Sequence, residues 1–216
     1  MSEATEERRT LKDRVLEAAL AHAAFDGWSK RTLLNAAADA GIERATVQRL
    51  FPQGGDSLLA WLDDWADRRM LEAVAGEDLQ RLPIRRRVAR VVRARLEALT
   101  PHREAVSKAL AARGMPYGIA AAGRTLWHTV DLVWETVGMP GGADEGWSWY
   151  TRRASLAGLM VTTTLYWLED QSEGLADSWA FLDRRVEDVV RIGKLRGRIV
   201  DIWRTLPGLR PAPSRR

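Results

Sequence analysis

The sequence predicts an all-α protein, and three observations support that prediction. Apolar residues recur at the three- and four-residue spacing of amphipathic helices throughout the chain, and no segment keeps the alternation of a strand. Alanine, leucine, arginine and glutamate, which are good helix formers, dominate the composition. Glycine and proline interrupt the periodic segments. The 216 residues suit a small helical head fused to a larger helical body.

The first part of the chain, residues 11–75, is expected to form the head. Helices are predicted, after a flexible N-terminus over residues 1–10, at 11–25, 29–40, 43–50 and 56–75. Ser29 is the expected N-cap of the second helix, because its hydroxyl can accept a hydrogen bond from a free backbone N–H. Gly41 is the expected C′ residue of the same helix.

Residues 83–193 are expected to form the body. Helices are predicted at 84–99, 101–113, 119–137, 147–168 and 178–192. A shorter helix is predicted at 194–206, and the proline- and arginine-rich tail at 207–216 is expected to be disordered.

The composition argues against several classes of function. The chain has no cysteine and three histidines, which form no metal-binding pair, so we expect no metal site. We find no nucleophile–base pair and no phosphate-binding loop, and we therefore expect neither catalytic residues nor a cofactor. The N-terminus is polar, without the apolar segment of a secretory signal. The longest mainly apolar run, 156–168, is too short to span a bilayer.

The order of elements in the head resembles a TetR-type helix-turn-helix, which implies a TetR-like fold with a helical ligand-binding body. The matching segments are Val15-Leu16-Glu17-Ala18-Ala19, Phe25-Asp26-Gly27-Trp28, Ala37-Ala38-Asp39-Ala40-Gly41-Ile42, Ala45-Thr46-Val47 and Leu50-Phe51-Pro52. In a TetR-type repressor the third helix enters the major groove of DNA. The resemblance would place there the residues Glu43, Arg44, Gln48 and Arg49.

The charge of this segment argues against DNA binding. Residues 28–51 contain four basic and two acidic side chains, which is weak for a surface that must neutralise several phosphates. Glu43 would repel phosphate at the start of the third helix. We therefore do not expect DNA as a partner. The alternative function is a TetR-family transcriptional regulator that binds DNA and a small hydrophobic effector.

The body resembles the Coq-nine family. The most specific segment is Trp149-Tyr150-Thr151-Arg152-Arg153-Ala154, and it is followed by Asp170, Ser172, Asp177-Ser178-Trp179 and Phe181-Leu182-Asp183-Arg184-Arg185-Val186. The resemblance implies a non-catalytic, lipid-binding accessory protein of ubiquinone biosynthesis. Such a protein would bind an isoprenoid quinone precursor or phospholipid and present it to a membrane-associated di-iron hydroxylase. The resemblance also implies a homodimer in the cytoplasm, peripherally associated with the inner (cytoplasmic) membrane.

Two apolar stripes are the candidate lipid-binding site. They consist of Leu126, Val130, Val133 and Val137 on one helix and Leu156, Leu159, Met160, Thr163 and Trp167 on another. Such stripes are ordinary core in most helical proteins; given the resemblance, we favour a pocket for an isoprenoid tail. We expect no histidine or carboxylate in this pocket.

The candidate partner-binding site comes from the resemblance, which implies that Asp131, Trp134, Trp149 and Tyr150 form the surface that binds the hydroxylase. Exposed aromatic side chains at a helix start are suited to anchor an interface. Adjacent side chains on a helix cannot both face one core, so the alternative is one core aromatic and one partly exposed aromatic.

The candidate membrane-binding helix is basic and amphipathic. Its residues are Lys194, Leu195, Arg198, Ile199, Ile202, Trp203 and Leu206. Basic side chains opposite an apolar face that includes tryptophan are typical of a helix that lies on an anionic membrane surface. The alternative is that this helix packs on the body or on a second copy.

A run of arginines marks the first body helix. The residues are Arg85, Arg86, Arg87, Arg90, Arg93 and Arg95. We expect a solvated basic face, and the alternative is contact with anionic head groups.

Overall fold

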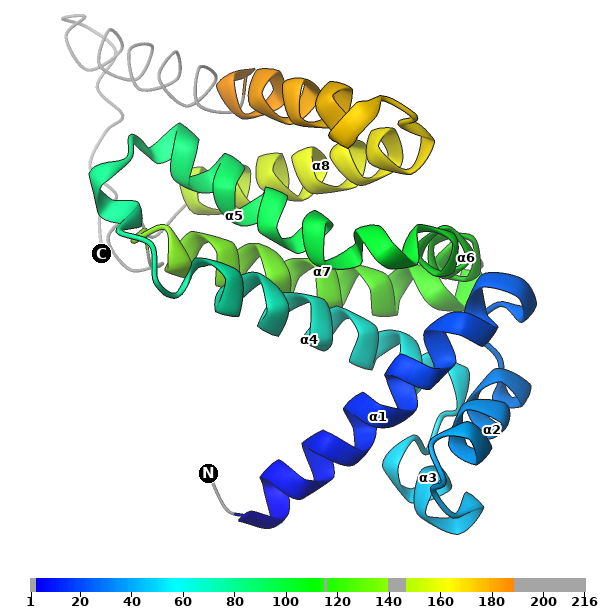
Figure 1. The fold of residues 1–216 in the computed structure, drawn as a ribbon. Helices are drawn as coiled ribbons and strands as arrows, with labels where there is room; N and C mark the ends of the chain where they lie inside the picture. The colour runs from blue at the N-terminus through cyan, green and yellow to red at the C-terminus, as the bar shows by residue number, and fades with distance from the viewer. Residues whose placement is uncertain (1–2, 115, 140–146, 189–216) are drawn as a thin grey trace, which may run out of the picture.

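The computed structural model describes residues 3–114, 116–139 and 147–188, and within these ranges the regular structure is helical, without strands (Figure 1). The head consists of α1 (Glu3–Asp26), α2 (Lys30–Asp39), α3 (Arg44–Leu50) and the start of α4 (Gly55–Val74). Helix α4 continues out of the head and packs on α5 (Ile84–Leu99) and α7 (Pro116–Thr136) of the body. One helix is therefore shared by both parts.

The first helix begins earlier than we predicted. Residues 3–10, expected as a flexible N-terminus, are the first two turns of α1. Glu3 and Glu6 place negative charge in the first turn, where it interacts favourably with the helix dipole. Arg9 also forms an ion pair with Glu6 at 2.7 Å. The prediction placed the start at the first apolar residue of the stripe, Leu11, but a helix can extend beyond its buried face.

The caps of α2 are those that the sequence predicts. The hydroxyl of Ser29 accepts a hydrogen bond from the backbone N–H of Thr32 at 3.1 Å. At the other end, Gly41 has a φ of +64°, and the N–H of Ile42 donates to the carbonyl of Ala37 at 2.9 Å. This is a Schellman C-cap, which turns the chain toward α3.

Trp28 contacts both the body and the start of α4. The indole N–H of Trp28 donates to the carbonyl of Ala105 on α6 (Arg103–Arg113) at 2.8 Å and so links head to body. Gly55 begins α4 so close to Trp28 that a Cβ there would lie 2.5 Å from the Trp28 carbonyl oxygen. Only glycine fits this approach without a shift of the backbone.

The body consists of α5 (Ile84–Leu99), α6, α7 (Pro116–Thr136), α8 (Trp147–Glu169) and a helix over 176–188. Three short 3-10 turns, Leu79–Arg81, Thr100–His102 and Glu173–Leu175, connect these elements. Helix α5 has the predicted bounds. Helix α7 begins at Pro116, three residues before the predicted start, because proline is well tolerated in the first turn of a helix.

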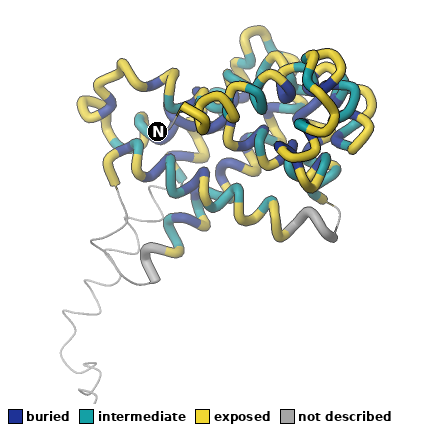
Figure 2. Tube along the Cα trace, turned by 90° about the horizontal axis from the view of Figure 1, so that it is seen from below, coloured by how far each residue is buried: buried dark blue, intermediate teal, exposed yellow. Residues whose placement is uncertain are grey.

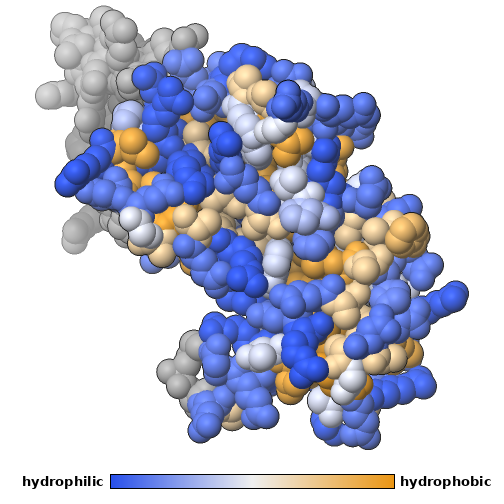
Figure 3. All heavy atoms as spheres, in the orientation of Figure 1, coloured by the Kyte–Doolittle hydropathy of each residue, from blue (hydrophilic) through white to orange (hydrophobic). Residues whose placement is uncertain are grey.

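The interior is divided between two groups of buried side chains, and Figure 2 shows how buried positions recur along the helices. One group fills the head and its junction with α5, α6 and α8; the other lies among α4, α5, α7, α8 and the helix over 176–188. Charged and polar side chains cover most of the face in Figure 3, with smaller apolar patches between them. No helix in the described ranges is long and apolar enough to cross a membrane.

The helix over 176–188 packs along α5. Its Leu182 and Val186 are buried in the body core. At the surface, Arg85 pairs with Glu187 and Arg86 with Asp183, each at 3.3 Å. Part of the arginine run on α5 is therefore neutralised by acidic residues of this helix.

The end of α8 is fixed by a buried carboxylate and an arginine. The carboxylate of Asp170 accepts hydrogen bonds from the N–H of Ser172 at 2.7 Å and from the N–H and hydroxyl of Ser178 at 2.8 and 2.5 Å. Arg103 donates to the carbonyls of Trp167, Leu168 and Asp170, which have no further partner within α8. Burial of Asp170 opposes its charge, but the serine hydrogen bonds outweigh burial and hold its pKa well below the ordinary value.

We predict that Asp170→Ala lowers the free energy of unfolding at neutral pH by about 2 kcal/mol, because the serine donors lose a charged acceptor. Since the pKa of Asp170 is lower in the folded than in the unfolded protein, its contribution is complete above the unfolded pKa and falls as the pH drops below about 4. Urea unfolding of both proteins between neutral and acidic pH measures the difference, which should shrink toward acid.

Asp177→Ala is the matched control, because Asp177 is exposed on the same segment. This variant should unfold within about 0.5 kcal/mol of the parent at every pH. A difference between Asp170→Ala and the parent that stays constant with pH would contradict the assigned role of the carboxylate.

Candidate functional site

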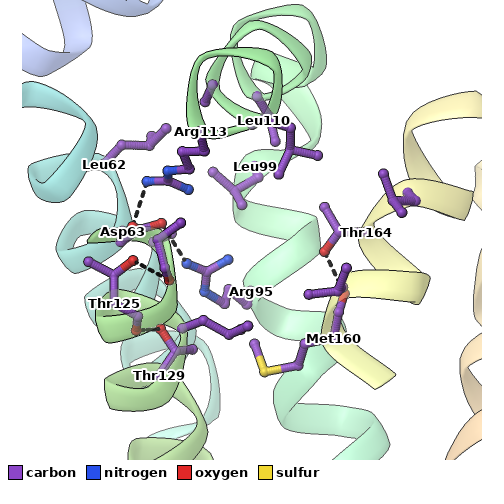
Figure 4. Close-up of a pocket in the computed structure, with 17 residues that line it drawn as sticks. Leu62, Asp63, Arg95, Leu99, Leu110, Arg113, Thr125, Thr129, Met160 and Thr164 are labelled. Carbon is purple, nitrogen blue, oxygen red and sulfur yellow. Dashed lines mark hydrogen bonds and ion pairs between the residues drawn. The ribbon is translucent and has the colours of Figure 1, made fainter. Parts of the chain in front are cut away.

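A cavity of about 150 Å³ lies among α4, α5, α6, α7 and α8 (Figure 4). Most of its wall is apolar. The apolar lining residues are Leu62, Ala66, Leu99, Val106, Ala109, Leu110, Ala122, Leu126, Met160, Val161 and Leu165. A concave apolar site with few polar groups is the usual form of a site for a hydrophobic small molecule.

One side of the cavity is polar. Asp63 of α4, Arg95 of α5 and Arg113 at the end of α6 lie together there, and Figure 4 shows Met160 and Thr164 of α8 on the opposite side. Arg113 Nη2 lies 2.6 Å from one carboxylate oxygen of Asp63, and Arg95 Nη2 lies 3.3 Å from the other. The carboxylate of Asp63 therefore joins two guanidinium groups from different helices.

The polar group also includes Thr129, which lines the cavity, and Asp67, which lies behind the wall, and we call these five residues the ion-pair cluster. Arg95 Nε donates to Asp67 at 2.7 Å, and the hydroxyl of Thr129 donates to the other oxygen of Asp67 at 2.8 Å. Two arginines thus balance two aspartates in the interior.

The pKa values within the ion-pair cluster follow from its burial. Burial raises the pKa of Asp67, although the charge and hydrogen bond of Arg95 act in the opposite direction. Burial also opposes the charge of Arg95, but the nearby carboxylates of Asp67 and Asp63 outweigh it and raise the pKa of that guanidinium. Arg95 is therefore a stable cation at the wall of the cavity.

Two expectations from the sequence are wrong here. The cavity has a carboxylate in its wall, Asp63, where we expected none. Arg95 is turned inward and paired, whereas we expected it on a solvated face. The sequence of α4 contained a signal for inward-facing carboxylates, because Asp63 and Asp67 are four residues apart among the apolar residues of its buried face. The partner arginines could not be assigned, since they lie 32 and 50 residues further along the chain.

The structure separates the predicted lipid-binding residues into two sets. Leu126 and Met160 line the cavity. The remaining residues are buried in the core outside the lining: Val130, Val133, Val137, Leu156, Leu159, Thr163 and Trp167. The Thr163 hydroxyl and the Trp167 indole nitrogen are buried without a hydrogen-bond partner in the described part of the chain. A lipid contact by any of these residues stays a prediction.

The predicted partner-binding residues differ in exposure. Tyr150 is 60% exposed at the start of α8, and the centroid of its ring lies 6.5 Å from that of the Trp127 ring. Asp131 accepts a hydrogen bond from Arg153, a buried member of the sequence motif, which joins α7 to α8. Trp134 is buried in the body core. The side chain of Trp149 lies outside the described residues.

The other two candidate surfaces lie at opposite ends of the chain. The predicted membrane helix, 194–206, and the tail, 207–216, lie outside the described residues. In the head, the side chains at and just before α3 for which the resemblance implies DNA contact are exposed: Glu43, Arg44, Gln48 and Arg49. The described ranges contain no group of histidines and carboxylates with metal-site geometry.

Comparison with protein families confirms the resemblance drawn from the body sequence. The sequence model of the COQ9 (Coq-nine) family matches residues 119–193. The matched segment includes the Trp149–Ala154 motif and most of α7 and α8.

Individual relatives extend the similarity into the head. The chain is 29% identical to "Ubiquinone biosynthesis protein COQ9, mitochondrial" of Drosophila melanogaster, over 84% of this chain and 56% of the relative. It is 28% identical to the Homo sapiens protein of the same name, over 87% and 60%, and 29% identical to that of Xenopus tropicalis, over 89% and 62%. The chain thus spans slightly more than half the length of these relatives.

Solved structures confirm the TetR-like fold. The TetR transcriptional regulator of Nitrosomonas europaea superposes with a TM-score of 0.68 at 20% sequence identity, over 84% of this chain and 98% of that one. A TetR transcriptional regulator from Rhodococcus superposes with a TM-score of 0.62 at 16% identity, over 86% and 97%. At this level of identity the likeness concerns the fold.

Proposed function

Because this chain is related in sequence to the COQ9 proteins and has a TetR-like all-helical fold, we propose that it serves ubiquinone biosynthesis as a non-catalytic accessory protein that binds a lipid. The bound molecule is an isoprenoid quinone precursor or a phospholipid. The protein presents it to the membrane-associated di-iron hydroxylase of the pathway and acts as a homodimer at the surface of the inner membrane.

The observation that best supports this proposal is the position of the COQ9 match relative to the cavity. The match covers 119–193, and this segment supplies the cavity walls from α7 and α8, including Leu126, Met160 and Leu165. The free energy falls when a hydrophobic ligand covers apolar surface that faces a cavity. A very insoluble molecule is therefore stabilised there relative to water.

We predict that lipid co-purifies with the full-length protein and that Ala122→Phe removes most of it. Ala122 is half-buried in the cavity wall, so a phenyl ring there takes up space that a ligand would fill. The measurement is native mass spectrometry, followed by extraction and identification of the lipid.

Ala121→Phe is the matched control, because the neighbouring alanine is exposed and does not line the cavity. This variant should retain the lipid. An empty cavity in repeated preparations of the parent protein, or equal lipid content in both variants, would contradict the proposal.

We place the hydroxylase-binding surface around Tyr150, whose ring is exposed at the start of α8 beside Trp127. Exposed aromatic residues on rigid helices often contribute most of the binding free energy of an interface. We predict that Tyr150→Ala weakens binding to the hydroxylase at least tenfold (about 1.4 kcal/mol or more) and leaves bound lipid unchanged, as measured by surface plasmon resonance.

Tyr166→Ala controls for the loss of a ring. Tyr166 is an exposed tyrosine of the same helix. It follows Tyr150 by sixteen residues, and this separation puts it on a different face of α8. If both variants bind the hydroxylase equally well, the surface lies elsewhere.

We assign membrane contact to residues 194–206, on the basis of their basic amphipathic sequence. Removal of residues 194–216 should lower co-sedimentation with anionic vesicles and leave the unfolding transition of the body unchanged. Unaltered co-sedimentation of the shortened protein would show that another surface contacts the membrane.

A further inference from the structure

The volume of the cavity limits which part of a lipid it encloses. The space of about 150 Å³ compares with engineered cavities of about that size, which take a molecule such as benzene. A polyprenyl tail of several isoprene units is much larger. The cavity therefore matches one ring, and the remainder of a prenylated ligand must lie outside it.

The polar side of the cavity retains hydrogen-bond donors. Arg95 uses Nε and Nη2 for Asp67 and Asp63, and its Nη1 makes no hydrogen bond with any described residue. Arg113 uses Nη2 for Asp63 and the carbonyl of Leu59, which leaves Nε and Nη1 without a bond to the described residues. A guanidinium has five N–H donors, and both side chains line the cavity.

The charge balance of the ion-pair cluster selects the kind of acceptor. Two aspartates already neutralise the two arginines, so an anionic ligand would have to displace Asp63 from a bond of 2.6 Å. A neutral oxygen can accept the remaining N–H groups without breaking an ion pair. Phenol hydroxyls and quinone carbonyls are such oxygens.

The other side of the cavity reaches the surface through apolar side chains. Val161 and Leu165 line the cavity and are 42% and 52% exposed. They are four residues apart on α8 and therefore lie on the same face of that helix. An isoprenoid tail that leaves the cavity here would continue to cover apolar surface.

We propose that the cavity binds the aromatic head of a prenylated phenol or quinone, with the ring oxygen at Arg95 and Arg113 and the isoprenoid tail leaving between Val161 and Leu165. This orientation rests on the proposed lipid-binding function and specifies it. The aromatic ring of the ligand is enclosed, and its isoprenoid tail lies along the outside of α8. The isoprenoid tail is therefore the part of the ligand that faces a membrane.

Two probes separate the ring from the tail: ortho-cresol, a phenol ring without a tail, and geranylphenol, the same kind of ring with two isoprene units. Affinities of the full-length protein are measured by calorimetry and by methyl NMR titration. Arg113→Met should weaken both probes about tenfold, because it removes a donor to the ring oxygen. Leu165→Asp should weaken geranylphenol at least ten times more than it weakens cresol, because it charges the exit of the tail.

Leu82→Asp is the control for a new charge at an exposed leucine, since Leu82 lies away from the cavity, and it should affect neither probe. A geranylphenol with a nitroxide at the end of its tail tests the orientation in the unaltered protein, where no variant has to fold. The nitroxide should broaden the methyl resonances of Leu165 more than those of Leu62, which lies beside Asp63 in the wall.

The outcomes distinguish this proposal from the function on which it rests. Binding of geranylphenol with greater broadening at Leu62, or equal effects of Leu165→Asp on both probes, would overturn the orientation and leave the lipid-binding function in place. Failure of the unaltered protein to bind either probe would overturn both the orientation and the binding of an isoprenoid quinone precursor.

Discussion

The ion-pair cluster is the constraint on which the arrangement of the body depends. Its side chains come from α4, α5, α6 and α7, so one set of charge-assisted hydrogen bonds fixes four helices relative to one another. Buried ion pairs contribute little net stability compared with apolar packing, because both charges lose their hydration. Loss of one partner is costly, however, since it leaves a buried charge unpaired. The cluster therefore acts mainly on which arrangement of the helices is adopted.

Several residues within the segment matched by the COQ9 family model have structural roles of the same kind. Arg153 joins α8 to α7 through Asp131, and Asp170 closes the end of α8 through Ser172 and Ser178. These contacts hold one wall of the cavity in place. The matched segment thus contains residues that support the site from behind as well as residues that face it.

The sequence was sufficient for elements that depend on local chemistry. Pro83 and the periodic stripe after it define α5, and Ser29 and Gly41 define the ends of α2, because caps act within a few residues. The cavity depends on distant partners and was predicted less well. The spacing of Val130, Val133 and Val137 identified the inward face of α7 correctly, but periodicity cannot tell a filled interior from an open one. Among the predicted lipid residues, only Leu126 and Met160 face open space.

Helix α4 has a mechanical consequence. It is continuous from Gly55, which is wedged against Trp28 in the head, to Val74 in the body, and it contributes Leu62, Asp63 and Ala66 to the cavity wall. A helix of twenty residues is about 30 Å long and bends little. Outward displacement of its middle, which would enlarge the cavity, would therefore also move its first turns, because the helix is continuous. The width of the cavity and the orientation of the head are thus coupled through α4.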